Sequence, residues 1–383
     1  MRTLYLHIGT HRTATSSIQA FMHANNEILP GMGILYPYNV RRHLQLANQI
    51  LNGQRDVAEV ARDLNARADS RKADIHSIVL SDEDISMRGE LSVLKQFRDH
   101  FDVKVIFSLR RQDLWLESWF LQNIKWQWNK SLSHCTFDEF LARRGEFHWA
   151  AYNSYVQHLE ALFGKENIIL QVFEKEQMRD GPVVEFARAI GITSMDGLTQ
   201  PPHINSSQSP MMTEFMRCLP LDEAPPNFRS HLEKACSQVD GALIKEGADS
   251  SSLLIDHATR LEILAEHAPG NRLLAQRYFG RDQLFIAPVP GPDAPVAPMR
   301  LPDDSYDTMR KFVEPFVRAL IAAEKDRQVV LPGAGPGQRM VGNPAVGGPG
   351  GKKQGQGKGK GGKKGKAGPG SPGGPRKSTG VAD

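Results

Sequence analysis

Residues 4–19 read LYLHIGTHRTATSSIQ, and this stretch decides the fold. It predicts a buried strand, a tight polar turn and the start of a helix. Successive backbone N–H groups in such a turn, with the positive end of the following helix behind them, form an anion site. The hydroxyls of Thr15, Ser16 and Ser17 add donors, and Arg12 adds a full positive charge. We therefore expect a phosphate cradle at this turn.

The spacing of the turn separates it from the common loop of nucleotide hydrolases. That loop reads GxxxxGK[ST], with a glycine and a lysine directly before the hydroxyl residue. Here Gly9 is followed by four residues and then by Ala14, Thr15 and Ser16, and the basic residue, Arg12, lies upstream of them. A strand-to-helix connection with a Ser/Thr-rich cap would give a similar pattern without any ligand. The interpretation therefore depends on other segments.

A second segment places positive charge at the end of another buried strand. Residues 103–109 form a β-branched apolar run that ends in Arg110 and Arg111, and residues 112–128 follow a helical pattern. Ligands in open parallel sheets bind at the carboxyl edge of the strands, so these arginines are well placed for a second phosphate. Arg111 is either a second contact or a surface charge. Both arginines could also be solvated residues at a helix start, although cations are slightly unfavourable there.

A third segment places carboxylates at the end of a strand. Residues 77–80 form a short apolar run, and after one serine the sequence Asp-Glu-Asp follows at residues 82–84. In a parallel sheet these carboxylates would lie at the same edge as the two basic segments. The structural alternative is a capping cluster, in which Asp82 or the preceding serine caps the helix that holds Leu91 and Leu94.

In combination these segments resemble sulfotransferases, which take a sulfuryl group from 3′-phosphoadenosine 5′-phosphosulfate (PAPS). Their 5′-phosphosulfate loop commonly shows a lysine and then Thr-Gly-Thr-Thr or similar residues, whereas here Arg12 replaces the lysine and Ala14 the glycine. The arginine is not a neutral replacement, because its planar fork and bulk differ from a compact ammonium. An arginine at a strand end with a serine eight residues later, as in Arg110 and Ser118, resembles the 3′-phosphate motif. The similarity covers about residues 2–286.

The resemblance implies an α/β fold of the P-loop NTPase-like sulfotransferase type, with three layers and a parallel sheet flanked by helices. It implies PAPS as the donor. Its donor-binding residues would be His11, Arg12, Thr13, Ala14, Thr15, Ser16, Ser17, Arg110 and Ser118. The arginine-plus-glycine segment that many relatives add to this site is not recognisable, and Arg281 is the candidate for part of it.

Sulfuryl transfer also needs a base that removes the acceptor proton as the new bond forms, and a carboxylate or a histidine suits that task. The acidic segment is similar to the strand ends where several carbohydrate sulfotransferases carry their base glutamate. We therefore expect Glu83 as the catalytic base and Arg12 as the catalytic cation. Asp82 is the second candidate base, and His7 or His11 would serve if the carboxylates point elsewhere.

The predicted function is transfer of a sulfuryl group by in-line displacement to a hydroxyl or amine of an acceptor, with a carbohydrate or a lipid-linked glycan favoured. One alternative is a P-loop kinase or NTPase, which the cradle supports and the missing Gly-Lys pair opposes. Another is a non-catalytic nucleotide-binding protein that is anchored by a basic tail. Trp115, Trp119 and Trp126 recur at roughly helical spacing and are expected in the core or in the wall of an acceptor groove.

Composition indicates one enzyme domain with an appendage. The chain has 383 residues, 40% of them hydrophobic, which is enough for one sizeable core in residues 1–330. Within this domain, residues 201–262 are broken by prolines and are expected to form acceptor-side helices. Residues 331–383 contain 19 of the 34 glycines and almost no large apolar residues, so we expect a disordered tail.

The positive charge of the chain belongs to this tail. Residues 331–383 carry ten basic residues and one acidic residue, a net charge of +9, so the +4 of the whole chain leaves −5 for residues 1–330. A nucleic-acid-binding enzyme body is therefore not indicated. The tail itself could contact a polyanion such as nucleic acid, an anionic membrane or an acidic polysaccharide, with strong salt dependence, or it could serve solubility alone.

Other sequence signals are weak. The three cysteines, Cys135, Cys218 and Cys236, have no CxxC spacing, and the thirteen histidines form no HxxxH-type signature, so no metal is expected. The amino terminus enters a strand almost at once, and no long apolar run follows. We therefore expect neither a signal peptide nor a transmembrane segment, and a cytoplasmic enzyme.

Overall fold

The structure is a computed structural model that describes residues 1–200, 208–247 and 253–329. The chain divides into two units, residues 1–330 and 331–383. The second unit, for which the sequence predicts a disordered basic tail, lies outside the described residues, as do residues 201–207 and 248–252 of the region where acceptor-side helices are expected.

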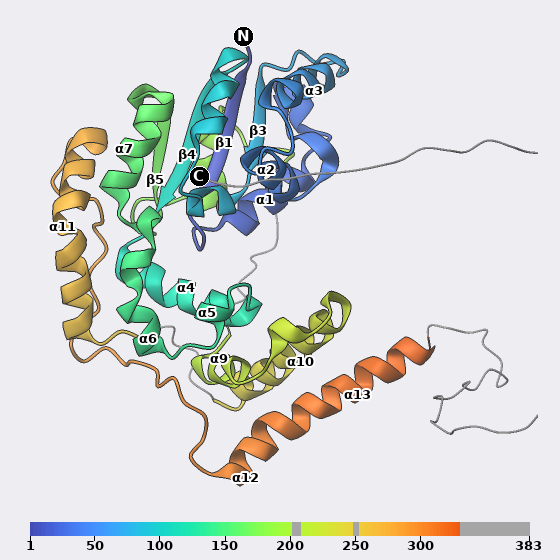
Figure 1. The fold of residues 1–383 in the computed structure, drawn as a ribbon, viewed down its shortest axis with the longest axis vertical. Coiled ribbons are helices and arrows are strands. Elements are labelled where there is room, and N and C mark those ends of the chain that lie inside the picture. Colours follow the sequence, from blue (N-terminus) through green and yellow to red (C-terminus); the bar gives the residue numbers. More distant parts are fainter. Residues whose placement is uncertain (201–207, 248–252, 330–383) are drawn as a thin grey trace, which may run out of the picture. The chain divides into compact units, whose positions relative to one another are not determined.

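The centre of the first unit is a five-stranded, all-parallel sheet in the order β2-β3-β1-β4-β5 (Figure 1). The strands are β1 (Thr3–Gly9), β2 (Ile34–Leu35), β3 (Ser77–Ser81), β4 (Asp102–Leu109) and β5 (Ile168–Val172). Leu4 of β1 lies opposite Ile78 of β3 and Val103 of β4. Because β1 lies between β3 and β4, the segments that leave these three strands meet at one edge of the sheet.

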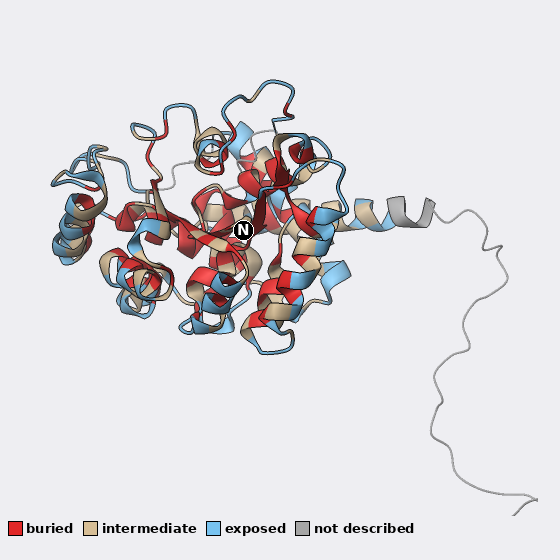
Figure 2. Ribbon diagram, turned by 90° about the horizontal axis from the view of Figure 1, so that it is seen from above, coloured by how far each residue is buried: buried red, intermediate tan, exposed pale blue. Residues whose placement is uncertain are grey.

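Successive side chains along the strands point to opposite faces of the sheet, and each face carries an apolar cluster. Leu4, Leu6 and Ile8 belong to the larger cluster, with residues of α2 (Leu44–Leu51), α3 (Val57–Asp69), η4 (Ser92–Asp99) and α7 (Tyr152–Phe163). Val79 and Ile106 belong to the second cluster, with residues of α1 (Thr15–Ala24) and α8 (Pro182–Ala189). Figure 2 shows the buried residues gathered along the strands. The predicted α/β fold with a parallel sheet flanked by helices is confirmed.

Helix α4 (Gln112–Trp126) follows β4 directly, at the carboxyl edge of the sheet (Figure 1). Trp115 and Trp119 are buried in its core-facing side with nearly parallel rings, their centroids 5.8 Å apart, as expected for core residues. The helix ends at Gln127, which has a left-handed φ of 42°, and the next residue, Trp128, is exposed. Further along the chain, α5 (Lys130–Ser133) and α6 (Phe137–Ala142) follow.

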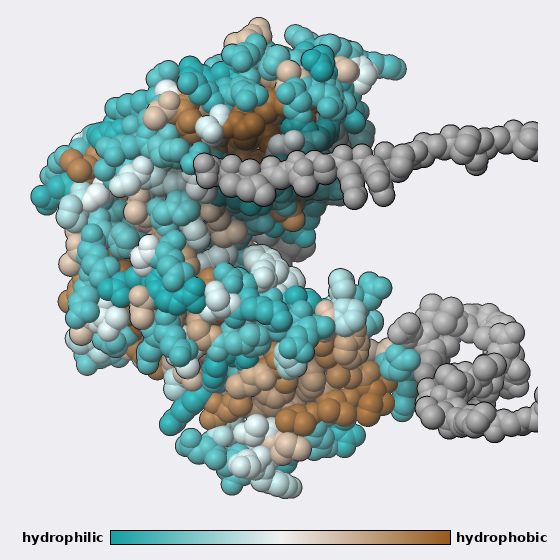
Figure 3. All heavy atoms as spheres, viewed as in Figure 1, coloured by the Kyte–Doolittle hydropathy of each residue, from teal (hydrophilic) through white to brown (hydrophobic). Residues whose placement is uncertain are grey.

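The region predicted to hold acceptor-side helices contains α9 (Pro210–Arg217) and α10 (Pro226–Lys245). Each of these helices begins with a proline. Proline is favourable there, because the backbone N–H that it lacks would have no partner in the first turn of a helix. The remaining helices are α11 (His257–Phe279), α12 (Ser305–Thr308) and α13 (Glu314–Val329). Figure 3 shows apolar surface over α10 and α13. In the described residues, no helix combines the length and apolar character needed to cross a membrane.

Short helical turns complete the unit. They are η1 (Leu29–Met32), η2 (Pro37–Asn39), η3 (Glu83–Met87), η5 (Arg144–Glu146), η6 (His148–Ala150), η7 (Lys165–Asn167), η8 (Leu221–Glu223) and η9 (Met309–Val313).

Candidate active site

The turn after β1 has an unusual backbone. Gly9, Arg12 and Ala14 have positive φ values of 82°, 66° and 62°, which only glycine adopts readily. A Cβ atom on Gly9 would lie 2.8 Å from the Cβ of Glu83, so the turn packs directly on the end of β3. Two left-handed non-glycine residues in one turn indicate strain that the surrounding contacts maintain, which is common at functional sites.

Helix α1 begins without a side-chain cap. Its N-cap residue is Ala14, whose carbonyl accepts from the N–H groups of Ser17 and Ile18 at 2.9 and 3.1 Å. The N–H groups of Thr15 and Ser16 precede the first intrahelical donors, so they are available to an anion at the positive end of the helix. This end therefore has the backbone geometry of the predicted cradle.

Two of the predicted loop side chains hold the turn itself. The hydroxyl of Thr13 donates to the carbonyl of Thr10 at 2.6 Å. The Nε2 atom of His11 lies 2.8 Å from Oδ1 of Asp84, and the carbonyl of His11 accepts from the indole of Trp115. These side chains fix the turn, whereas the exposed Ser16 is at its surface.

The structure brings Arg12 and Ser118 together. The Nε atom of Arg12 donates to the hydroxyl of Ser118 at 2.5 Å, and its Nη1 donates to Oε1 of Gln122 at 3.3 Å. Ser118 and Gln122 are four residues apart on α4, so they share one face of the helix. Burial lowers the pKa of Arg12 from its usual value.

Arg110 approaches the same turn from β4. Its Nη1 donates to the carbonyl of Arg12 at 2.9 Å, and its own backbone N–H and carbonyl both bond to the hydroxyl of Tyr152. Burial, with the nearby charge of Arg12, lowers the pKa of Arg110 to about 10. A bound dianion would stabilise both guanidinium groups through charge-assisted hydrogen bonds.

Arg111 lies in a different environment. Its Nε and Nη2 donate to the two carboxylate oxygens of Asp113 at 2.8 and 3.0 Å, and its Nη1 donates to the carbonyls of Ala287 and Pro288. The residue is buried. The surface-charge interpretation of Arg111 is therefore wrong, because Asp113 compensates its charge inside the protein.

The carboxylates after β3 are held by one arginine that sequence reasoning missed. Arg42 contacts Asp82 at 2.8 Å, Asp84 at 2.5 Å and Glu83 at 3.4 Å. Glu83 also accepts from the amide of Gln19 at 2.6 Å. Glu83 is thus buried, oriented by α1 and placed beside the turn after β1.

The other two carboxylates differ in their protonation behaviour. Burial, which Arg42 only partly offsets, raises the pKa of Asp82 to about 6. Burial also acts on Asp84, but the hydrogen bond from His11 and the charge of Arg42 outweigh it and lower its pKa. Asp82 does act as a cap, since it accepts from the N–H of Asp84. It caps η3, however, and not the turn that holds Leu94.

The two histidines proposed as alternative bases are buried. The Nδ1 atom of His7 lies 2.8 Å from the hydroxyl of Ser81, and its ring lies 4.8 Å from that of Phe186 under α8. Burial lowers the pKa of His7 to about 4, although the charge of Glu83 opposes the shift. His7 is therefore neutral near pH 7. His11 is held by Asp84 in the turn.

An aromatic pair lies beside the turn. The ring of Trp128 is 6.3 Å from that of His11 and 6.0 Å from the nearly parallel ring of Trp126. The left-handed Gln127 directs Trp128 toward the turn. The side chain of Gln127 is fixed because it donates to the carbonyls of Met216 and Leu219 and accepts from the N–H of Asp222. Trp128 is half exposed, so its ring is available to a ligand at the surface.

The residues that sequence reasoning missed had different signals. Gln19 lies four residues after Thr15, and Gln122 lies four residues after Ser118, so helical spacing alone could have added both. Arg42 had no comparable signal, since it lies 40 residues before Asp82 and its role depends on the fold.

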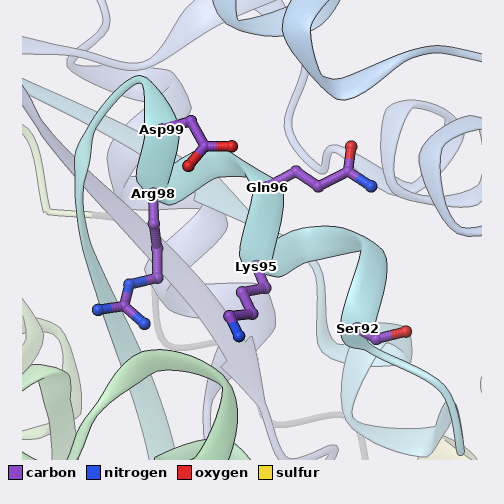
Figure 4. Close-up of a pocket in the computed structure, with 5 residues that line it drawn as sticks. All are labelled: Ser92, Lys95, Gln96, Arg98 and Asp99. Carbon is purple, nitrogen blue, oxygen red and sulfur yellow. The ribbon is translucent and has the colours of Figure 1, made fainter.

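Two other features, Arg281 and a surface pocket on η4, are not part of this cluster of contacts. Arg281 donates to Gln177 and to the carbonyl of Leu284. An open surface pocket is lined by Ser92, Lys95, Gln96, Arg98 and Asp99 of η4. Figure 4 shows that these side chains do not converge on one point. The segment leads into the start of β4, at the opposite edge of the sheet from the turn, so we assign it no role in the site.

Comparisons with known proteins give distant matches. No known protein-family profile matches the chain. An uncharacterised protein of Archaeoglobus fulgidus is 24% identical over 204 residues, which make up 51% of this chain and 52% of that protein. The chain thus spans about half the length of this curated relative. The crystal structure of a sulfotransferase from Alicyclobacillus acidocaldarius matches over 64% of this chain and 95% of its own, with a TM-score of 0.35 and 16% identity.

Proposed function

We propose that this protein is a sulfotransferase that takes a sulfuryl group from PAPS. The observation that carries the proposal is the meeting of two basic segments at the carboxyl edge of β1 and β4. Arg12 donates to Ser118 at 2.5 Å, and Arg110 donates to the carbonyl of Arg12 at 2.9 Å. A donor with a phosphosulfate on one side of its ribose and a 3′-phosphate on the other suits two such sites.

In this proposal the turn and the start of α1 bind the 5′-phosphosulfate, and Arg110 with Ser118 binds the 3′-phosphate. The uncapped helix start at Ala14 supports the first assignment, because its N–H groups point to an anion site. The lowered pKa of Arg110 supports the second, since a bound dianion would relieve the cost of two neighbouring, partly buried cations.

The reaction would be an in-line displacement. The acceptor oxygen or nitrogen forms a bond to sulfur while the bond from sulfur to the bridging phosphate oxygen breaks. Arg12 neutralises the charge that develops on this leaving oxygen, and Glu83 takes the acceptor proton. The hydrogen bond from Gln19 and the contact with Arg42 support Glu83 as an oriented carboxylate.

The contacts of Arg42 also bear on the kinase or NTPase alternative. Such an enzyme needs a strand-end carboxylate that helps to hold Mg²⁺. Asp82 and Asp84 both contact the guanidinium of Arg42, at 2.8 and 2.5 Å. An arginine that occupies these oxygens competes with a cation, so the geometry favours sulfuryl transfer over metal-assisted phosphoryl transfer.

The aromatic pair supports a carbohydrate acceptor, either free or as a lipid-linked glycan. The exposed Trp128 lies beside His11, and the carboxylate of Asp84, after β3, contacts the same histidine. A flat indole face binds the apolar face of a sugar ring, while carboxylates accept hydrogen bonds from its hydroxyls.

The first experiment is a calorimetric titration of the full chain with 3′-phosphoadenosine 5′-phosphate, the product nucleotide, beside ATP, GTP and 5′-AMP. We expect the bisphosphate to bind most tightly, and its binding to be unchanged by EDTA. Preference for ATP, or no binding of the bisphosphate, would contradict the proposal and favour the alternatives.

The base is tested with Glu83→Gln, which keeps the size and the hydrogen-bonding side chain but cannot take a proton. Removal of a general base typically slows a reaction by about 100- to 10,000-fold. We expect turnover of radiolabelled donor to fall to this extent with unchanged affinity for the bisphosphate. The exposed Glu90→Gln is the matched control. Full activity in Glu83→Gln would move the base to another residue, and binding without turnover in the wild type would favour a non-catalytic protein.

A further inference from the structure

Helix α4 places a further cation beside the turn after β1. Arg12 donates to Ser118 and to Gln122, which lie four residues apart on one face of α4. Lys125 follows Gln122 by three residues, so it continues this face by one turn. Burial lowers the pKa of Lys125, and the nearby charge of Arg12 lowers it further. Lys125 and Arg12 therefore act on one another's charge from the same side of α4.

Two indole rings connect Lys125 to the same turn. The Nζ atom of Lys125 lies 5.4 Å from the centroid of the Trp126 ring, and this ring is nearly parallel to that of Trp128, at 6.0 Å. The ring of Trp128 in turn lies 6.3 Å from that of His11, the residue before Arg12. Trp128 is half exposed, and Lys125 and Trp126 are partly buried. We call Lys125, Trp126 and Trp128 the α4 patch, which borders the proposed site with one positive charge and two flat apolar rings.

Two carboxylates of α10, those of Glu233 and Asp240, favour the charged form of Lys125. Each of them also has a partner of its own. The carboxylate of Glu233 pairs with Arg229 at 3.1 Å, and that of Asp240 accepts from the hydroxyl of Ser209 at 2.5 Å. An anion that reaches Lys125 from the side of the indoles therefore breaks neither of these pairs. Helix α10 thus supports a positive charge next to the two rings.

We propose that the α4 patch is an acceptor subsite that selects a carbohydrate with a negative charge. The inference rests on the proposed function, because it names the class of acceptor for the same site. The indole of Trp128 packs on the apolar face of a sugar ring, and Trp126 supports that indole from behind. The ammonium of Lys125 donates charge-assisted hydrogen bonds to a carboxylate or a sulfate ester of the same oligosaccharide. A neutral oligosaccharide would use the indoles without the charge.

The test is calorimetry of the full chain with three probes: a hexasaccharide of alternating glucuronate and N-acetylglucosamine, its carboxyl-reduced neutral form, and a sulfated chondroitin hexasaccharide. We expect at least one charged probe to bind roughly 10- to 150-fold more tightly than the neutral one, as a hydrogen bond to a charged group contributes. The two charged probes distinguish a carboxylate from a sulfate ester. Lys125→Gln should abolish the preference, and Lys125→Arg should keep it. Equal affinities for charged and neutral probes, or no binding of any probe, would overturn the proposal.

Matched controls separate recognition by Lys125 from a structural role. Lys95→Gln removes an exposed lysine of η4, away from the site, and should bind all probes like the wild type. Trp128→Ala should weaken the charged and neutral probes alike. If Lys125 only supported packing on α10, Lys125→Gln would lower the free energy of unfolding and weaken all probes equally, which would overturn the proposal. Charge-selective binding without transfer from PAPS would support the subsite and contradict only the proposed function.

Discussion

Arg110 and Arg111 are consecutive residues at the end of β4, yet they belong to two different electrostatic regions. Arg111 joins a buried ion network, in which it pairs with Asp113, while Arg260 pairs with Asp113 at 2.6 Å and with Glu117 at 2.7 Å. Arg110 instead donates to a backbone carbonyl, and burial, together with the nearby charge of Arg12, lowers its pKa to about 10.

The difference distinguishes charged groups that stabilise the fold from charged groups that are suited to bind a ligand. In the ion network each buried cation meets carboxylates inside the protein, so nothing further is needed for its stability. At Arg110 burial and the nearby Arg12 raise the cost of the charge, and an anionic ligand would lower it. Helix α4 carries residues of both regions, with Asp113 and Glu117 facing α11 and Ser118 facing the turn after β1.

The largest expected effect concerns the ion network. Arg260→Met would leave Asp113 and Glu117 with less compensation for their buried charge, and breaking a buried pair in this way costs about 3–5 kcal/mol. We expect the free energy of unfolding, measured by urea titration, to fall by this amount. Arg318→Met, which removes an exposed pair with Glu314, should change it little. An equally small effect of Arg260→Met would show that the network is not structural.

The second effect concerns catalysis. Arg12→Ala removes the proposed charge stabilisation at the leaving oxygen, which typically contributes about 3–4 kcal/mol, or roughly 100- to 1,000-fold in rate. We expect the rate of transfer from radiolabelled PAPS to fall by this factor. The free energy of unfolding should change much less than it does in Arg260→Met. The exposed Arg62→Ala, on α3, is the control for loss of a positive charge. Near-full turnover of folded Arg12→Ala would remove Arg12 from the mechanism.

A smaller effect concerns His43, a buried histidine that the fold keeps uncharged. Burial lowers the pKa of His43 to about 4, against an ordinary value of 6.5 in the unfolded chain. Because the folded state resists protonation, the stabilising contribution is present above pH 6.5 and is lost as the pH falls toward 4. Between pH 7 and pH 5 the loss from this residue is about 2 kcal/mol.

The measurement is the difference in unfolding free energy between the wild type and His43→Gln at both pH values. The comparison is needed because Asp82 has a raised pKa of about 6, so its protonation stabilises the folded state over the same fall in pH. We expect the variant to lose less stability than the wild type on acidification. Parallel pH profiles of the two proteins would show that His43 is not held neutral by the fold.

Most of the sheet could be predicted because its strands are short, continuous apolar runs whose burial on both faces leaves a local signal. The runs at residues 77–80 and 103–109 correspond to β3 and β4 with shifts of one residue. Strand β2 has only two residues and owes its place to pairing with β3, which no local pattern reveals.

The candidate site was predictable only in its local parts. The turn after β1 and the spacing from Arg110 to Ser118 can be recognised from residues that are close in the sequence. The structure brings Arg12 and Ser118 into contact. Which of two consecutive arginines turns inward depends on Arg260, which is far away in the sequence and binds Asp113. The grouping of three carboxylates by Arg42 likewise depends on the folded chain.

The central claim is that Arg110 and Ser118 hold a phosphate beside the turn after β1. Its most direct test is a calorimetric cycle in which the wild type and Arg110→Ala are each titrated with 3′-phosphoadenosine 5′-phosphate and with 5′-AMP. Hydrogen bonds to charged groups contribute about 1.5–3 kcal/mol, so the variant should bind the bisphosphate roughly 10- to 150-fold more weakly and 5′-AMP almost unchanged. Equal losses for the two nucleotides would contradict the account, because Arg110 would then not recognise the 3′-phosphate.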